Sequence, residues 1–205
     1  RILQAYRKEV PAGKKIVMGE IGFKFVEPAD SLLQAENLRR AAAHPNASMD
    51  DSQMFVYDYM YGTDMADALF QTIGAGYSGC IAWMLDDAMH FKEAPDKLKI
   101  WGFWNIFGDE IFGAGEERVR PWYYAWSLLC RTLRPGSDFF AVDVQGAAGV
   151  KAIAAVKDGR HTVAVVNVSG EPRRVRIECP DWNRLERAAR YRYGEGLMRT
   201  EGDHM

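Results

Sequence analysis

One carboxylate, Glu20, stands where enzymes often place a reactive acid. It directly follows the apolar run Ile16-Val17-Met18-Gly19, which predicts a strand buried on both faces of a parallel sheet. The carboxyl ends of such strands hold the active site in (β/α)₈ barrels, and a charge beside a dry interior is costly unless it is paired. Two interpretations stay open: a catalytic carboxylate, or a Glu in an ordinary turn that pairs with Lys or Arg.

Trp83 holds the corresponding place on a second apolar run, Gly79-Cys80-Ile81-Ala82-Trp83. A Trp at the end of a strand can stack on the apolar face of a sugar ring, or it can simply fill the core. Phe23, three residues after Glu20, can form an apolar wall beside the same site.

The segment 86–112 mixes aromatic rings with carboxylates and Asn. Rings can stack on sugars, whereas Asp and Asn can hydrogen-bond sugar hydroxyls, and a loop this long in a compact domain is often functional. The alternative is that the rings plug the interior. We single out Asp86, Asp87, Trp101 and Trp104 as binding candidates among a larger set of such side chains, which also includes His90, Phe91, Phe103, Asn105, Phe107, Asp109 and Glu110.

Other kinds of chemistry have weaker signals. The four His residues are scattered and the three Cys residues are far apart, so we expect no metal, no cofactor and buried free thiols. Asp86 and Asp87 match no EF-hand pattern, and Ser78 is not part of a nucleophile elbow. The net charge of −2 favours neither nucleic acid nor a membrane as partner, and we find no apolar run of about 18 residues.

The order of elements predicts how these residues are positioned. The pattern indicates helices and buried strands in alternation, which implies parallel strands joined by right-handed crossovers. We expect residues 1–134 to form the C-terminal part of a (β/α)₈ barrel. The chain starts without Met and within a predicted helix, so we also expect residue 1 not to be the natural start. The predicted elements are a helix over 1–10, a strand over 14–19, helices over 28–46 and 63–73, a strand over 79–85, a long loop over 86–119 and a helix over 122–133.

The character of the sequence changes near residue 135. Short β-type runs over 139–144, 150–157, 162–168 and 173–178 are separated by glycine-containing turns, and the Asp158-Gly159 pair signals a hairpin. Residues 135–205 are therefore predicted to form a small antiparallel β-sandwich domain.

In this order, the motifs resemble clan A glycoside hydrolases. Residues 16–23 look like the seventh barrel strand, which ends in the nucleophile Glu, and residues 76–83 look like the eighth, which often ends in a Trp of the −1 subsite. Pro121-Trp122-Tyr123-Tyr124-Ala125-Trp126 is similar to the start of the last barrel helix, and the β-domain is similar to that of families 5, 30 and 39.

The resemblance implies a retaining hydrolase of β-glycosidic bonds with Glu20 as nucleophile and a carbohydrate substrate. It also implies an acid/base Glu after an Asn on the fourth strand, and that strand would lie upstream of residue 1. We therefore expect the 205-residue chain to be inactive alone and to require an upstream half of the barrel or another copy. Relatives that degrade polysaccharides are usually exported, which implies a secreted or periplasmic location.

Three rival interpretations remain. The first is a non-catalytic carbohydrate-binding protein or degenerate hydrolase, which keeps Trp83 and the loop aromatics but lacks the acid/base. The second is a metal-dependent barrel hydrolase, for which these strands offer only Glu20 and the Asp86-Asp87 pair. The third is a purely structural fragment whose β-domain mediates contacts between chains, and whose exposed apolar surface pairs with another copy or rests on a missing segment.

Overall fold

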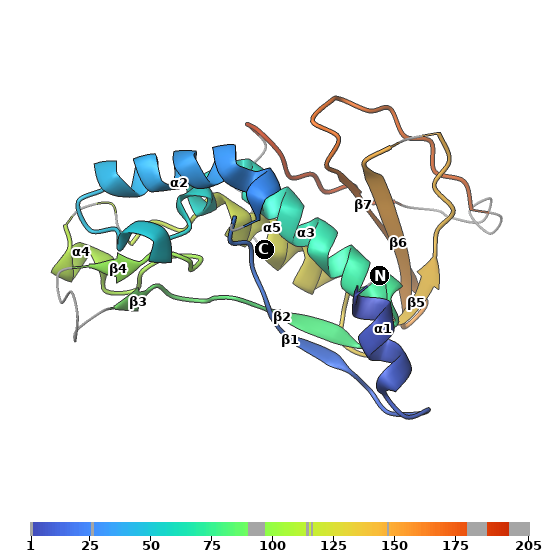
Figure 1. Ribbon diagram of the computed structural model, residues 1–205. Helices are drawn as coiled ribbons and strands as arrows, with labels where there is room; N and C mark the ends of the chain where they lie inside the picture. Colours follow the sequence, from blue (N-terminus) through green and yellow to red (C-terminus); the bar gives the residue numbers. More distant parts are fainter. Residues whose placement is uncertain are drawn as a thin grey trace.

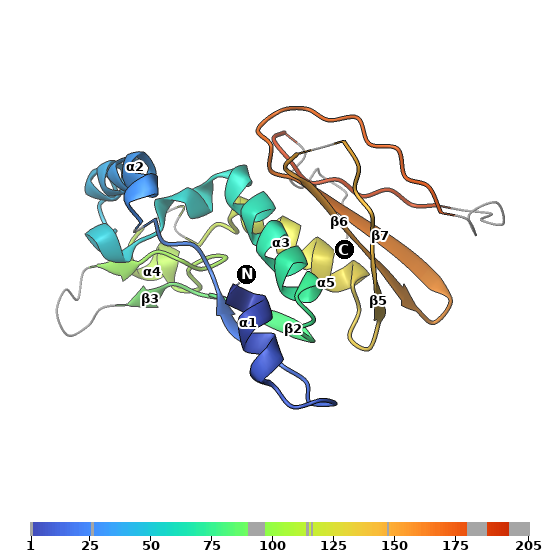
Figure 2. The ribbon, with the colours of Figure 1, turned by 45° about the vertical axis from the view of Figure 1, so that its right-hand side comes forward.

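The computed structural model describes residues 2–25, 27–89, 97–113, 115, 117–146, 148–179 and 188–196. It is a mixed structure of helices and small sheets (Figure 1). A parallel strand pair lies below two long central helices, and an antiparallel sheet stands on the other side of those helices, as the rotated view also shows (Figure 2). Within the described residues, no helix combines the length and the apolar character needed to cross a bilayer.

The first part of the chain forms the predicted strand–helix–strand unit. After helix α1 (Ile2–Glu9), strand β1 (Val17–Ile21) runs parallel to strand β2 (Gly79–Ala82), with Val17 opposite Gly79 and Ile21 opposite Ala82. The crossover between them contains α2 (Ser31–Ala43), α3 (Tyr59–Gly74) and three short 3₁₀ turns: η1 (Pro28–Asp30), η2 (Met49–Asp51) and η3 (Met54–Tyr57). The parallel pairing of the two apolar runs is thus confirmed.

The prediction that both strands are buried on both faces is wrong for this chain. Ile21 and Ala82 pack against the hydrophobic core on the helix side, whereas the side chains of Val17 and Ile81 are 53% and 59% exposed. The reason is geometric: α3 covers one face of the pair, and no described element covers the other. Two strands do not close a barrel, so the barrel itself remains a prediction.

The long loop predicted after β2 contains secondary structure. Strands β3 (Ala88–Met89) and β4 (Leu98–Lys99) form a short antiparallel ladder, and a single helical turn, α4 (Gly108–Ile111), follows. Leu98, Ile100 and Phe103 from this segment enter the first hydrophobic core, together with Tyr61 and Trp122. The segment therefore folds back onto the helices instead of spreading over the surface.

Helix α5 (Pro121–Thr132) packs beside α3, and both helices support the antiparallel sheet. This sheet has the order β5 (Asp138–Ala141), β6 (Val150–Lys157) and β7 (Arg160–Asn167). The predicted hairpin at Asp158-Gly159 is confirmed, since both residues adopt positive φ angles, 49° and 72°. The second hydrophobic core joins helices and sheet and contains Ala66, Leu69, Phe70, Leu129, Ile153 and Val166.

The predicted β-sandwich is not formed by the described residues. They make a single three-stranded sheet, whose inner face packs against α3 and α5 and so needs no second sheet. Residues 173–178, predicted as a fourth strand, pair with no strand in the described part, and their Val175 and Ile177 side chains are exposed. Alternating apolar and polar residues suit a strand, but a strand also needs a neighbouring strand with which its backbone can form hydrogen bonds.

The C-terminal segment 188–196 returns to the helices. The Tyr193 hydroxyl donates a hydrogen bond to the carbonyl oxygen of Tyr59 at 2.7 Å. This close approach favours a glycine at position 62, because a Cβ atom there would lie 2.5 Å from the Tyr193 hydroxyl oxygen and the Tyr193 side chain would have to shift. The hydrogen bond therefore ties the segment 188–196 to the first turn of α3.

Candidate functional site

Glu20 lies near the carboxyl end of β1, where the two parallel strands finish side by side. The Trp83 amide donates a hydrogen bond to the Ile21 carbonyl at 2.8 Å, which brings the first residue after β2 next to the end of β1. The Glu20 side chain is exposed and forms no hydrogen bond or ion pair with the described residues. Among the described residues the carboxylate thus has no Lys or Arg partner, and it is accessible.

Trp83 and Trp101 meet at the same strand ends. Measured from the position that a Cβ atom on Gly22 would occupy, the Trp83 Cβ lies at 3.7 Å and the Trp101 Cζ3 at 3.6 Å. Trp83 is 40% exposed, and Trp101 is half-buried. We call Gly22, Trp83 and Trp101 the aromatic corner. It is an apolar surface of the kind on which a sugar ring can stack.

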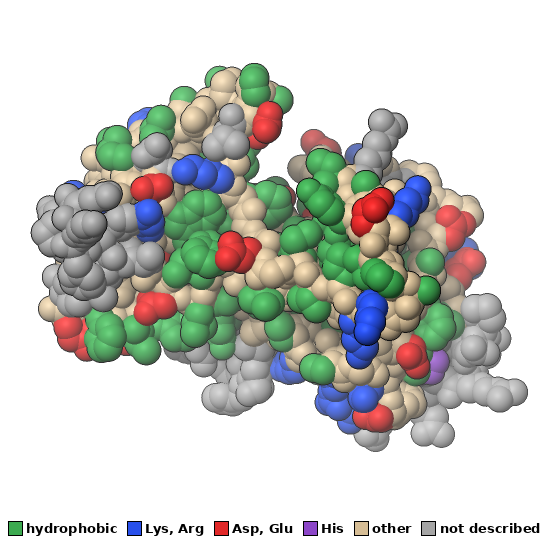
Figure 3. Space-filling model, turned by 60° about the horizontal axis from the view of Figure 1, so that its bottom comes forward, with side chains coloured by type: hydrophobic (Ala, Val, Ile, Leu, Met, Phe, Trp, Pro, Cys, Tyr) green, Lys and Arg blue, Asp and Glu red, His purple; other side chains and the backbone are tan. Residues whose placement is uncertain are grey.

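The surface around the strand pair is largely apolar. Figure 3 shows this underside, with hydrophobic side chains across its middle and single acidic side chains among them. The exposed apolar side chains on and after β1 and β2 include Val17, Ile81, Trp83 and Leu85. A contiguous apolar surface is typical of a ligand-binding or protein-binding face.

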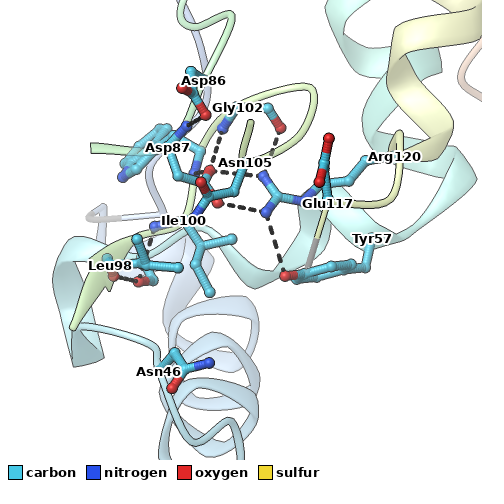
Figure 4. A network of polar contacts seen from close by, with 12 residues as sticks. Asn46, Tyr57, Asp86, Asp87, Leu98, Ile100, Gly102, Asn105, Glu117 and Arg120 are labelled. Carbon is cyan, nitrogen blue, oxygen red and sulfur yellow. Dashed lines mark hydrogen bonds and ion pairs between the residues drawn. The ribbon is translucent and has the colours of Figure 1, made fainter. Parts of the chain in front are cut away.

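Asp87, predicted to bind substrate, is instead buried. Its side chain is fully covered and pairs with Arg120, whose side chain is 2% exposed (Figure 4). Arg120 donates from Nη2 to Asp87 Oδ2 at 2.5 Å and from Nη1 to Oδ1 at 2.7 Å. Burial opposes the charge of Arg120, but its hydrogen bonds with Asp87 and the charge of that carboxylate raise its pKa above the ordinary value. Both oxygens are occupied, so Asp87 is not available to a ligand.

Asp86 is also used internally. Its Oδ1 accepts hydrogen bonds from the amides of Ile106 at 3.0 Å and of Asp87 at 2.9 Å. Gly102 packs against its backbone so closely that a Cβ atom would lie 2.6 Å from the Asp86 carbonyl carbon. Asp86 therefore organises the segment that follows β2.

Phe23 and Trp104 are half-buried and pack against the first hydrophobic core. The Phe23 ring packs edge-on against Tyr61, and its carbonyl accepts a hydrogen bond from Gln53 Nε2 at 2.5 Å. Trp104 is half-buried against Tyr123. Both rings gain more from packing beside Tyr61 and Tyr123 than they could at the surface.

Other sequence predictions have mixed outcomes. His90 and Phe91 lie outside the described residues. The three cysteines are free, but Cys130 is exposed and the other two are half-buried. In the described ranges, no cluster of three or more His, Cys, Asp or Glu side chains could hold a metal ion.

Sequence reasoning missed Arg120 and Tyr57. Arg120 precedes Pro121 at the start of α5, and its Nη2 donates to the Tyr57 hydroxyl at 3.4 Å. An Arg at a helix start normally faces water, so the sequence offers no sign of its burial. The nearest signal was the adjacent acidic pair Asp86-Asp87, one member of which needed a cation.

The structure thus brings Glu20, Trp83 and Trp101 to one edge and places Asp86 and Asp87 behind it as supports. Comparison of the chain with protein-family models, with curated proteins and with solved structures gives no match.

Proposed function

We propose that this chain carries the nucleophile side of the active site of a retaining β-glycoside hydrolase, with Glu20 as the nucleophile. The observation that carries the proposal is an accessible carboxylate near the carboxyl end of a parallel strand, which pairs with no described residue, and an exposed Trp directly after the neighbouring strand. In barrels of parallel strands this edge is where catalytic side chains gather.

The proposed reaction has two steps. The Glu20 carboxylate attacks the anomeric carbon and forms a glycosyl ester, while a second carboxylic acid protonates the departing glycosidic oxygen. That second group then removes a proton from water, and the water attacks the anomeric carbon and releases Glu20. The two carboxyl groups must lie about 5–5.5 Å apart. Asp86 and Asp87 are both engaged internally, so the acid/base is proposed to come from outside this sequence.

The strand pair supports the idea that the sheet continues in the complete protein. Parallel sheets are normally covered on both faces, and the side chains of Val17 and Ile81 stay exposed here. We infer that an upstream half of a (β/α)₈ barrel, or another copy of the chain, supplies the missing strands together with the acid/base.

A trapping experiment on the full-length protein tests this function. A panel of activated 2-deoxy-2-fluoro-β-glycosides should label Glu20, identified by peptide mapping, because the fluorine slows hydrolysis of the ester. Glu20→Ala should abolish hydrolysis of aryl β-glycosides, and azide should restore product formation as the α-glycosyl azide. Glu27→Gln, an exposed Glu in the segment after β1, is the matched control and should retain activity.

Two outcomes would contradict the proposal. One is a folded full-length protein that hydrolyses no aryl β-glycoside in the panel. The other is labelling of a carboxylate other than Glu20 with activity retained in Glu20→Ala.

The exposed corner also favours a second candidate, a non-catalytic carbohydrate-binding protein. Its supporting observation is that Trp83 is 40% exposed while both nearby Asp side chains are engaged internally. Glu20→Gln separates the two functions: loss of turnover with oligosaccharide binding retained supports the hydrolase. Binding by a wild-type protein without turnover supports the second candidate.

A further inference from the structure

We infer that Asp87 and Arg120 are positioning residues, whose buried ion pair holds Trp101 in the aromatic corner beside the end of β1. The inference rests on the proposed function only for what the corner binds. Its structural part, that the pair sets the place of Trp101, can be tested without any activity.

Asp87 holds the backbone of Trp101 directly. Its Oδ1 accepts the amide of Trp101 at 2.9 Å and the amide of Gly102 at 2.8 Å, as well as Arg120 Nη1 at 2.7 Å. Figure 4 shows Asp87, Gly102 and Arg120 together, with dashed lines that join each of the three to the other two. One carboxylate oxygen therefore fixes two consecutive residues of the segment that carries the Trp101 ring.

Arg120 holds the same point from the carbonyl side. Its Nη1 also donates to the Gly102 carbonyl at 2.8 Å, and Trp122 Nε1 donates to that carbonyl at 3.1 Å. Because the guanidinium is a rigid planar fork, these bonds fix direction as well as distance. The backbone of residues 101–102 is thereby held through both its N–H and C=O groups.

The indole ring is held at its other end. Trp101 Nε1 donates to the Asp51 carbonyl at 2.5 Å, while the opposite part of the ring approaches Gly22. A ring fixed at its backbone and at its N–H has little freedom left. This is the pre-organisation that a stacking surface needs, since a ligand then does not have to order the side chain.

A buried ion pair is a costly way to obtain stability alone. Well-packed apolar residues in its place are often as stable or more so. The distinctive property of the Asp87–Arg120 pair is its geometry, with backbone contacts at residues 101 and 102. The pair therefore contributes more to the position of Trp101 than to the stability of the core.

The first test follows Trp101 by ¹⁹F NMR in full-length protein labelled with 5-fluorotryptophan. Trp101→Phe identifies its resonance. Asp87→Asn should shift or broaden that resonance, because the amide cannot pair with the Arg120 fork and accept both backbone amides. Asp109→Asn is the matched control, since Asp109 accepts the amides of Gly115 and Glu117 in the same part of the chain but does not bond Trp101.

A second variant keeps the test valid if Asp87→Asn does not fold. The double variant D87A/R120M removes the pair without leaving a buried charge, and it should also shift or broaden the Trp101 resonance. An unmoved Trp101 resonance in the folded variant or variants would overturn the inference.

The second test uses an aryl β-glycoside that the full-length protein hydrolyses. Asp87→Asn should raise KM about tenfold and leave kcat within about twofold, since a displaced stacking wall weakens ground-state and transition-state binding alike. A merely structural role would lower Tm and leave KM unchanged at temperatures well below Tm. If the wild type hydrolyses no glycoside, the proposed function fails, while the ¹⁹F result still decides whether the pair positions Trp101.

Discussion

Two of the three sheets in the described residues, the parallel strand pair β1–β2 and the antiparallel sheet β5–β6–β7, lie in regions held together by different interactions. The segment after β2 combines core packing by Leu98, Ile100 and Phe103 with buried polar contacts, of which Asp87–Arg120 is the most enclosed. The sheet β5–β6–β7 is held by apolar contacts, with Ile153 and Val166 packed against α3 and α5. Its strands are hairpin neighbours, whereas β1 and β2 are joined through a long helical crossover.

This difference separates a scaffold from a site. An antiparallel sheet backed by helices buries one face and pairs its strands locally, so it can form within a short stretch of chain. The parallel pair leaves Val17 and Ile81 exposed and presents Glu20 and Trp83 at its edge. Directional polar contacts suit a region that must hold particular side chains in particular places.

The largest expected effect is the loss of the buried cation. Arg120→Leu leaves the Asp87 carboxylate buried without its partner and should lower the free energy of unfolding by about 3–5 kcal/mol, measured by urea denaturation. Arg39→Leu, which breaks an exposed pair with Glu36, should cause a much smaller loss. If Arg120→Leu and Arg39→Leu lowered the free energy of unfolding equally, the buried Asp87–Arg120 pair would be no more important than an exposed pair.

Alanine substitutions at Ile153 and at Ile81 compare the antiparallel sheet with the parallel strand pair directly. Ile153→Ala in β6 should cost about 2–4 kcal/mol, because its side chain is 6% exposed and its removal leaves a cavity. Ile81→Ala in β2 should change stability by less than about 0.5 kcal/mol in the 205-residue chain, because that side chain is 59% exposed.

The same isoleucine pair sharpens the proposal of a larger sheet. If further strands cover β2 in the full-length protein, Ile81→Ala should lower its stability as much as Ile153→Ala does. A small loss at Ile81 in that protein would contradict the proposed barrel.

A pH effect is expected on α3, which connects the two regions. Burial, reinforced by the charge of Asp67, raises the pKa of Asp64 to about 6. Because this pKa lies above the unfolded value, Asp64 favours folding below about pH 4, and that contribution is lost as the pH rises through about 6. Asp64→Asn should therefore stabilise the protein by about 2 kcal/mol at pH 8 and by almost nothing at pH 4.

The Asp64 measurement must be made as a difference between variant and wild type. Hydrogen bonds from Arg39 and Arg40 lower the pKa of Glu36 to about 2. Glu36 therefore makes the protein more stable as the pH rises, which is the opposite of the effect of Asp64. Asp138→Asn, at an exposed position in β5, is the control variant. A pH-independent effect of Asp64→Asn would contradict the assignment.

The smallest effect is expected where the segment 188–196 contacts α3. Tyr193→Phe removes the hydrogen bond to the Tyr59 carbonyl and should lower the unfolding free energy by about 1 kcal/mol. Tyr191→Phe is the matched control, since Tyr191 is 54% exposed and a Phe ring would keep its contact with Arg131. Identical thermal midpoints for the two variants would mean that the segment adds nothing to stability.

Much of the fold could be predicted because its signals are local. The apolar runs at β1 and β2, the helical spacing of α3 and the Asp158-Gly159 turn each depend on residues close in sequence. The predictions that fail are those about which segments lie next to each other in space. Residues 173–178 alternate as a strand does but have no neighbouring strand in the described part, and the antiparallel sheet is covered by helices instead of a second sheet.

The sequence by itself determined that Glu20 and Trp83 follow apolar strands, since periodicity and chain order suffice for that. Only the tertiary structure decided which polar and aromatic side chains stay available. In the sequence, Asp87 is as suitable for binding a ligand as any other loop carboxylate. In the structure, Arg120, 33 residues later, donates hydrogen bonds to both of its oxygens. Such pairings depend on how distant segments pack, because a buried charge needs its partner in space and not in sequence.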